Sequence, residues 1–273
     1  MYPPVDPTIF EIGPFALRWY GLLMAAAVMV GTWLAGREVA RRGYDPDEFW
    51  EMLVWVLVPA FIGARLYYVF VQSSEPGFYF ANPGQILQIW SGGIHIFGAF
   101  IVGGLALWLF TKWRNLPTLV YLDAVAVALP LSQAIGRWGN FINQELYGPP
   151  TTAPLGLRID PNRRIAPYDD LTLYPDSTRF YPLFLYESVW NLIGFGLLFY
   201  LSHRFKQQLK PGDLILVYLI WYPLGRFFIE FLRTDSWFFP GTPFNVVHLL
   251  SAAAVIGGAI ALWRRHRSPT SQM

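Results

Sequence analysis

Seven long apolar segments are the feature that most limits what this chain can fold into. An α-helix needs about 20 mostly apolar residues to cross the hydrocarbon core of a bilayer, so stretches of roughly 18 or more indicate membrane spans. Such stretches lie at about 17–36, 50–71, 93–111, 118–136, 182–201, 213–232 and 244–263. The pattern predicts an all-α integral membrane protein with about seven transmembrane helices.

The composition agrees with a membrane protein and limits what lies outside the bilayer. The 273 residues are 54% hydrophobic and 14% charged, which leaves too little polar surface for a soluble body of this size. We expect a single membrane domain over residues 1–273. Residues 141–181, between the fourth and fifth spans, are rich in turn-forming residues and predict a small head of short strands and loops. A second excursion, at 72–91, is predicted to lie along the membrane interface as an arm.

Several classes of function are excluded or made improbable by the residues that the chain lacks. It has no cysteine, which excludes disulfides, thiolate metal sites and a cysteine nucleophile. No metal or other cofactor is expected, and no basic, aromatic-rich patch suggests a nucleic acid partner. The residues before the first span have no basic segment and no cleavage site, so we expect no removable signal peptide.

The positions of Lys and Arg predict the orientation of the chain. Cytoplasmic loops carry the excess of these residues, and one set of alternating flanks holds most of them. These are Arg37, Arg41, Arg42, Lys112, Arg114, Arg204, Lys206, Lys210, Arg264, Arg265 and Arg267. The N-terminus and the head are therefore expected outside, and the C-terminus in the cytoplasm.

Six charged residues in or next to the predicted spans are candidates for a buried site, because an unpaired charge at membrane depth is costly. They are Arg65, Asp123, Arg137, Glu187, Arg226 and Glu230. One interpretation is that they form a buried functional site. The other is that they pair with one another and only hold helices together, an alternative that stays open for Arg65 and Asp123 above all.

Arg226, Glu230 and Arg233 are spaced four and three residues apart, which predicts one helix face. Glu230 is expected to hold both arginines through carboxylate hydrogen bonds. One carboxylate between two guanidinium groups leaves net positive charge, and a guanidinium offers paired donors to phosphate. We therefore predict a site for the headgroup of an anionic phospholipid, although a purely intrahelical ion pair would use the same spacing.

A dense polar segment follows the fourth apolar stretch. Residues 136–148 read G-R-W-G-N-F-I-N-Q-E-L-Y-G, which resembles the G-R-x-G-N-F-x-N-x-E-x-x-G signature of the bacterial prolipoprotein diacylglyceryl transferase family. Four shorter matches extend the resemblance over nearly the whole chain. They are R-W-Y-G at 18–21, G-A-R at 63–65, Y-E at 186–187 and Y-P-L-G-R-F-F-I-E-F-L-R at 222–233.

The resemblance implies transfer of an sn-1,2-diacylglyceryl group from phosphatidylglycerol to the lipobox cysteine of a prolipoprotein, in the bacterial inner membrane. The products would be a thioether and glycerol 1-phosphate, whose developing charge Arg137 and Arg226 could stabilise. Asn140 and Asn143 would hydrogen-bond lipid oxygens, and Glu145 would orient an arginine or the acceptor peptide; alternatively, these three residues only cap the span. Tyr20 is either a headgroup contact or an interfacial anchor.

The pattern breaks at two positions where the family commonly has histidine. Phe97 and Tyr181 occupy them, and His95 lies two residues before Phe97. His95 is therefore either the base that activates the acceptor thiol or a hydrogen-bonded interfacial residue. We assign catalysis to Arg137, Arg226 and His95. Substrate binding is assigned to Tyr20, Arg65, Asn140, Asn143, Glu145, Gly148, Glu187, Tyr222, Glu230 and Arg233.

Two other classes of function share some of these features. A lipid or anion transporter would also place arginines in the membrane, but its site usually lies between internal repeats, and none is visible here. A catalytically silent paralogue that binds anionic lipid or lipoprotein would retain the arginines and lack the family's histidine.

Overall fold

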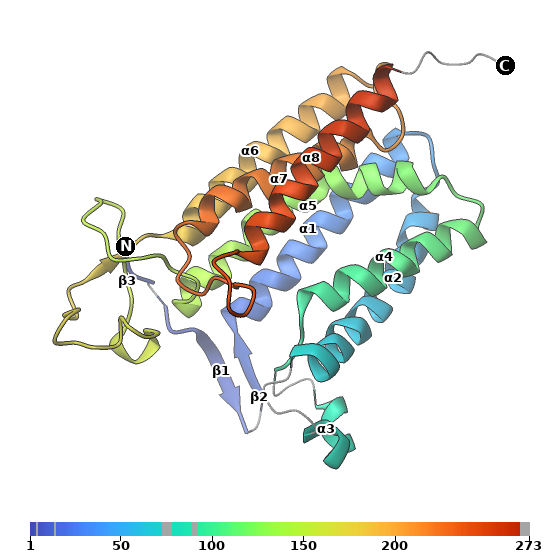
Figure 1. Cartoon of the computed structure of the whole chain (residues 1–273). Coiled ribbons are helices and arrows are strands. Elements are labelled where there is room, and N and C mark those ends of the chain that lie inside the picture. Colours follow the sequence, from blue (N-terminus) through green and yellow to red (C-terminus); the bar gives the residue numbers. More distant parts are fainter. Residues whose placement is uncertain (4, 14, 73–77, 89–91, 268–273) are drawn as a thin grey trace. The chain divides into compact units, whose positions relative to one another are not determined.

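The long helices of the chain follow its apolar segments. The computed structural model describes residues 1–3, 5–13, 15–72, 78–88 and 92–267 (Figure 1). The long helices are α1 (Trp19–Arg41), α2 (Pro46–Tyr67), α4 (Ile96–Trp113), α5 (Thr118–Asn143), α6 (Leu183–Arg204), α7 (Asp213–Glu230) and α8 (Val246–Arg267). The predicted all-α membrane fold is confirmed.

All seven predicted spans are helical in the part of the chain that the structure describes. Six of the helices are long and apolar enough to cross a membrane. The remaining one, α7, has 18 residues and carries Asp213, Arg226 and Glu230, which lower its apolar character. Helix α5 continues past the predicted end of the fourth span near 136, as far as Asn143. Helical hydrogen bonds join backbone groups, so a helix continues through polar residues that end the hydrophobic pattern.

The chain forms two compact units, which are described separately. The larger unit contains residues 1–35 and 123–273, and the smaller unit contains residues 36–122. In the larger unit, α7 packs against both α6 and α8, and the three helices run side by side (Figure 1). Side chains such as Ile256 and Trp263 on α8 are more than half exposed, as expected for a surface that faces lipid. The single membrane domain over residues 1–273 stays a prediction.

The larger unit has two apolar cores. One joins α5, α6 and α7 and includes Val127, Leu198 and Leu214. The other, formed by Phe141, Tyr147, Leu157, Ile159, Phe180 and Phe184, fixes the head to the ends of α5 and α6. This second core holds the signature segment between helix and head.

The head is built from loops and very short strands, as predicted. Strands β3 (Leu157–Arg158) and β4 (Arg179–Phe180) pair antiparallel, and a short 3₁₀ turn covers Pro161–Arg163. A second antiparallel pair, β1 (Thr8–Ile12) with β2 (Phe15–Arg18), precedes α1 and was not predicted.

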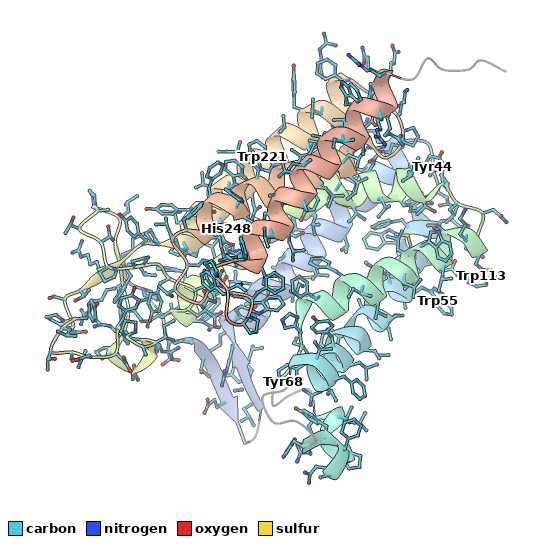
Figure 2. All side chains as sticks on the ribbon, in the orientation of Figure 1. Tyr44, Trp55, Tyr68, Trp113, Trp221 and His248 are labelled. Carbon is cyan, nitrogen blue, oxygen red and sulfur yellow. The ribbon has the colours of Figure 1, made fainter. Side chains whose placement is uncertain are left out.

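In the smaller unit, α2 and α4 pack side by side along their lengths. Figure 2 shows Trp55 and Trp113 together at one end of this pair and Tyr68 toward the other, and the rings of the two tryptophans are 5.8 Å apart. The predicted arm at 72–91 is described in full only over 78–88, where it forms the short helix α3 (Phe78–Ala81) and a 3₁₀ turn at Pro83–Leu87. Residues 73–77 and 89–91 lie outside the described residues. The placement of the arm at the membrane interface stays a prediction.

Candidate functional site

Three arginines meet at one buried carboxylate in the larger unit. Glu187 lies in the first turns of α6 and is 6% exposed. Its Oε2 pairs with Nη2 of Arg137 from α5. Its Oε1 accepts a hydrogen bond of 3.2 Å from Nη1 of Arg226 on α7 and lies 3.8 Å from Nη1 of Arg233. Glu187 therefore gathers positive charge from two segments that are far apart in the sequence, one on α5 and one at the end of α7.

Two further carboxylates, those of Glu230 and Asp235, pair with arginines of this cluster. Glu230 Oε2 lies 2.6 Å from Nη2 of Arg226, and its Oε1 accepts a 3.0 Å hydrogen bond from Asn245. Arg233 instead donates to Asp235, at 2.9 Å and 2.5 Å. The prediction that Glu230 holds both arginines is wrong for Arg233. Because α7 ends at Glu230, Arg233 lies in the following turn rather than on the same helix face.

The signature residues continue the network from Arg137. Nη1 of Arg137 donates to Oδ1 of Asn140 at 3.4 Å, and Nδ2 of Asn140 donates to Oε1 of Glu145 at 2.7 Å. Asn143 approaches the same Glu145 oxygen at 3.5 Å. Glu145 therefore orients the Asn140 amide, which in turn contacts the arginine that pairs with Glu187.

Two tyrosines lie close to Arg137. The Tyr222 hydroxyl interacts with its guanidinium group. The ring of Tyr20, at the start of α1, rests against the backbone of α5 at Gly139, where a Cβ atom would lie 2.7 Å from the ring. This close approach at Gly139 brings Tyr20 beside the signature.

The end of the signature is fixed to the head and to the segment after α7. Gly148 donates its N–H to the carbonyl of Tyr181 at 2.9 Å, and a Cβ atom at Gly148 would lie 2.9 Å from the carbonyl oxygen of Leu232. Tyr147 accepts the Ile165 N–H at 2.7 Å through its hydroxyl oxygen, and burial raises the pKa of this tyrosine.

A pair of tryptophans that the sequence did not reveal joins α6 to α7 next to this cluster. Trp190 and Trp221 stack with ring centroids 4.3 Å apart, and each indole N–H donates to the other residue's carbonyl at 3.1 Å. The Trp190 ring lies against Gly225, where a Cβ atom would be 2.2 Å from its Nε1. Trp190 follows Glu187 by one helical turn, so this contact sets the register that brings Glu187 to Arg226.

Comparison with known proteins identifies the family of the chain. The model of the prolipoprotein diacylglyceryl transferase family matches residues 7–264. The chain belongs to this family. Three relatives are each named phosphatidylglycerol–prolipoprotein diacylglyceryl transferase. The protein of Chloroflexus aggregans is 42% identical to this chain, that of Lactiplantibacillus plantarum 41% and that of Nostoc sp. 44%. Each alignment covers 98% of this chain, and it covers 93%, 92% and 93% of the three relatives, in the same order.

In this member of the prolipoprotein diacylglyceryl transferase family, Arg65 has a different environment from the cluster. It lies in the smaller unit, is 5% exposed, and directs its guanidinium group at backbone oxygens. The acceptors are the carbonyls of Ile86, Gly92, Gly93, Gln85 and Gln88, at 2.6–3.4 Å. The structure therefore gives Arg65 the role of holding the arm onto α2, and its part in substrate binding stays a prediction.

His95 immediately precedes α4 in the smaller unit and caps that helix. Its Nδ1 accepts the backbone N–H of Phe97 at 3.4 Å, and its ring stacks on Tyr67 with centroids 5.0 Å apart. The Phe97 ring lies 5.2 Å from the His95 ring. Of the two interpretations offered by the sequence, these contacts favour the hydrogen-bonded interfacial residue over the base. A catalytic role for His95 stays a prediction.

Asp123, the remaining buried charge, caps a helix. Its carboxylate accepts the backbone N–H groups of Gly212 and Ile215, at 2.8 Å and 2.9 Å, where α7 begins. The first N–H groups of a helix have no partner within it and carry partial positive charge, so a buried carboxylate is stabilised there. For Asp123, the structural interpretation is the better supported one.

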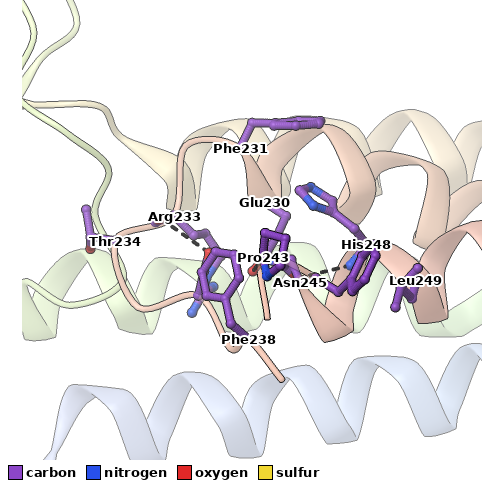
Figure 3. Close-up of a pocket in the computed structure, with 11 residues that line it drawn as sticks. Glu230, Phe231, Arg233, Thr234, Phe238, Pro243, Asn245, His248 and Leu249 are labelled. Carbon is purple, nitrogen blue, oxygen red and sulfur yellow. Dashed lines mark hydrogen bonds between the residues drawn. The ribbon is translucent and has the colours of Figure 1, made fainter. Parts of the chain in front are cut away.

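A cavity of 520 Å³ opens beside the arginine cluster (Figure 3). Its lining combines Glu230 and Arg233 with aromatic side chains of the segment before α8, and with His248 on α8 itself. His248 places Nε2 3.1 Å from the carbonyl oxygen of Phe227, which fixes the ring between α7 and α8. No sequence motif surrounds His248, so its place at the cavity could not be predicted. Among the described residues, no group of three or more His, Asp or Glu side chains is placed to hold a metal ion.

Proposed function

We propose that this chain transfers the sn-1,2-diacylglyceryl group of phosphatidylglycerol to the thiol of a lipobox cysteine in a prolipoprotein. A thioether forms and glycerol 1-phosphate leaves. The observation that carries the proposal is the convergence of Arg137, Arg226 and Arg233 on Glu187, beside the signature segment of the family. The relatives' names describe the same donor and acceptor for those proteins.

Arg137 and Arg226 would bind the phosphate and stabilise the leaving group. The thiolate attacks the carbon of the diacylglyceryl group that is bonded to the phosphate. The bond between this carbon and the phosphate oxygen breaks, and its electron pair stays on that oxygen. The phosphodiester carries one negative charge and the product phosphate carries more, so charge develops on the leaving group in the transition state. Guanidinium groups already held in place stabilise that developing charge more than the ground state, which lowers the barrier.

The carboxylates position the arginines for this task. Each of the three arginines has a carboxylate partner, namely Glu187, Glu230 or Asp235, so the resting cluster is close to charge balance. These partners are side chains, which can rotate when a phosphate arrives. A guanidinium group has five N–H donors, so it can bind a carboxylate and a phosphate at the same time. The cluster is therefore able to exchange carboxylate contacts for phosphate contacts without unfolding a helix.

The other predicted residues would complete the lipid site. Asn140, Asn143, Tyr20 and Tyr222 lie around Arg137 or Glu145 and would contact ester or glycerol oxygens. Glu145 would orient Asn140, and Gly148 would allow the head to lie close to the site. For Arg65 and His95, in the smaller unit, roles in substrate binding and in catalysis respectively stay predictions.

Guanidinium groups that lie closer to the acceptor thiol than their carboxylate partners do would also promote ionisation of this thiol. A cysteine has an unperturbed pKa of about 8.5, so a few per cent is thiolate at neutral pH, and nearby positive charge increases that fraction. A dedicated histidine at position 97 is then not essential. This explains how Phe97 is compatible with transfer.

The chain is a multi-pass membrane protein, and we place it in the bacterial cytoplasmic membrane with the N-terminus outside and the C-terminus inside. The distribution of Lys and Arg supports this orientation. Because the chain has no native cysteine, single cysteines report accessibility cleanly. A membrane-impermeant thiol reagent is expected to label Asn162→Cys in intact cells and to leave Asp45→Cys unlabelled; the reverse pattern would contradict the orientation.

Transfer is tested directly with purified protein. The protein is incubated with phosphatidylglycerol vesicles and a lipobox peptide, and the diacylglyceryl thioether and glycerol 1-phosphate are measured by mass spectrometry. A peptide with serine in place of the cysteine and vesicles of phosphatidylethanolamine alone are the controls. Binding of phosphatidylglycerol without product would indicate a silent paralogue, and movement of the lipid without product would indicate a transporter; either result contradicts the proposal.

A further inference from the structure

Gln144, in the middle of the signature, has an unusual backbone conformation. Its φ is +57°, and that of Leu146 is +55°. Side chains with a Cβ atom rarely adopt this left-handed region, because Cβ then lies too close to the following carbonyl oxygen. The residue directly follows the last residue of α5, Asn143. The chain therefore turns sharply at Gln144 at a conformational cost that some other contact must offset.

Asp160 of the head supplies that contact. Nε2 of Gln144 donates to Oδ2 of Asp160 at 2.7 Å, and the backbone N–H of Asp160 donates to Oε1 of Gln144 at 2.7 Å. Both polar atoms of the Gln144 amide are thus bound by one residue, and Gln144 is only 4% exposed. Asp160 is itself held in place, because it follows the fully buried Ile159 and its Oδ1 accepts the Tyr2 hydroxyl at 3.0 Å.

The turn at Gln144 decides where Glu145 lies. The Glu145 N–H donates to the carbonyl of Asn140 at 3.0 Å, and its carboxylate accepts the Asn140 amide at 2.7 Å. Asn140 in turn contacts Arg137. A right-handed conformation at residue 144 would direct the following residue elsewhere and break both contacts. The hydrogen bonds between Asp160 and Gln144 are therefore connected, through Glu145 and Asn140, to the arginine cluster.

We propose that Asp160 is a positioning residue, which holds Gln144 in the left-handed conformation and so places Glu145 and Asn140 beside Arg137. The inference rests on the proposed function for its effect on catalysis. It assigns a catalytic consequence to the head, which otherwise lies outside the arginine cluster. Neither Asp160 nor Gln144 contacts the substrate in this account.

Substitutions of Gln144 by alanine and by glycine separate positioning from substrate contact. Both remove the hydrogen bonds to Asp160, but only alanine keeps the Cβ atom that disfavours a positive φ. With alanine, the left-handed conformation is expected to fall to about a tenth of the population, and kcat falls about 10-fold with it. Glycine adopts the left-handed and right-handed backbone conformations about equally, so Gln144→Gly is expected to lower kcat only about twofold.

Substitutions of Asp160 give the matching series. Asp160→Ala is expected to lower kcat, but by less than Gln144→Ala does, because the backbone N–H of residue 160 can still donate to Gln144. Asp160→Asn retains an oxygen acceptor for Gln144 and should keep most of the activity. The double variant Gln144→Gly/Asp160→Ala should recover to within about threefold of the unsubstituted protein, because glycine no longer needs the contact. Asp170→Ala, which removes a local hydrogen bond of the head to Thr172, is the control and should have no effect.

Hydrogen exchange of the Glu145 amide in the purified protein measures the geometry without any activity assay. Exchange should accelerate in Asp160→Ala and Gln144→Ala and stay unchanged in Asp160→Asn and Asp170→Ala. Equal activity losses in Gln144→Ala and Gln144→Gly, or no rescue in the double variant, would overturn the proposal. If the unsubstituted protein transfers no diacylglyceryl group, the proposed function fails, while the exchange measurements still decide whether Asp160 holds this turn.

Discussion

Arg65 in the smaller unit and Arg226 in the larger unit are both largely buried, but their guanidinium groups have different kinds of partner. Arg65 donates to backbone carbonyls around one end of α2. Arg226 pairs with the side chains of Glu187 and Glu230. Backbone carbonyls cannot leave without unfolding the segment that carries them, whereas carboxylates can rotate. A buried arginine is therefore available to a ligand when its partners are side chains, and is structural when they are backbone.

The largest effect is expected from removing the arginines of the cluster. Arg137→Ala and Arg226→Ala should each reduce transfer at least ~10-fold, because a charge-assisted hydrogen bond to phosphate is worth about 1.5–3 kcal/mol. Arg137→Lys and Arg226→Lys should recover only part of the activity, since an ammonium cannot offer two parallel donors. Product formation at equal protein level is the measurement. Near-normal turnover in either alanine variant would remove the cluster from the phosphate site.

A smaller loss is expected from disturbing the helix register that assembles the cluster. Gly225→Ala would place a Cβ atom 2.2 Å from the Trp190 ring, so α6 and α7 must shift, at a cost of about 1–3 kcal/mol. Thermal stability and transfer should both fall. Gly196→Ala on α6 is the matched control, because its Cβ would meet no atom within 4 Å. Equal behaviour of the two variants would show that the tryptophan pair does not set the register.

Substitution of Arg65 should affect the arm more than the chemistry. Arg65→Ala leaves several backbone carbonyls without a donor, at about 1–3 kcal/mol for each one that stays buried, so hydrogen exchange over residues 78–88 should accelerate. Transfer should fall less than in Arg137→Ala. Arg114→Ala, which removes two exposed ion pairs, with Glu48 and Glu51, and a contact with the Trp113 ring, is the control within the same unit. A loss of transfer as large as that of Arg137→Ala, with unchanged exchange, would place Arg65 at the substrate instead.

The smallest effect is expected at His95. Asparagine can replace the histidine as a helix cap but cannot act as a base, so His95→Asn should lose well under the ~10²–10⁴-fold that removal of a general base costs. The measurement is kcat of His95→Asn relative to kcat of the unsubstituted protein. A loss in the full range for a general base, with normal binding of phosphatidylglycerol, would show that His95 activates the thiol and that the arginine field alone does not.

Much of the fold followed from local patterns, whereas the site followed only in part. Apolar stretches located every long helix, and turn-forming residues located the head. The members of the arginine cluster were all among the charged residues that the sequence placed in the signature and in the regions of α6 and α7. The spacing of Arg226, Glu230 and Arg233 predicted the wrong partner for Arg233, because spacing on an ideal helix does not reveal where the helix ends.

The sequence by itself determined that the chain is a helical membrane protein, because hydrophobic length and backbone hydrogen bonding are local properties. It also determined which arginine and amide side chains are present near the ends of the helices. Tertiary structure decided which of these groups meet. Arg137, Glu187 and Arg226 come from three helices, Trp190 and Trp221 from two, and Asp160 reaches Gln144 from the head. A buried charge or a strained turn is stabilised by whichever group lies within hydrogen-bond distance in space, and that distance has no counterpart in sequence separation.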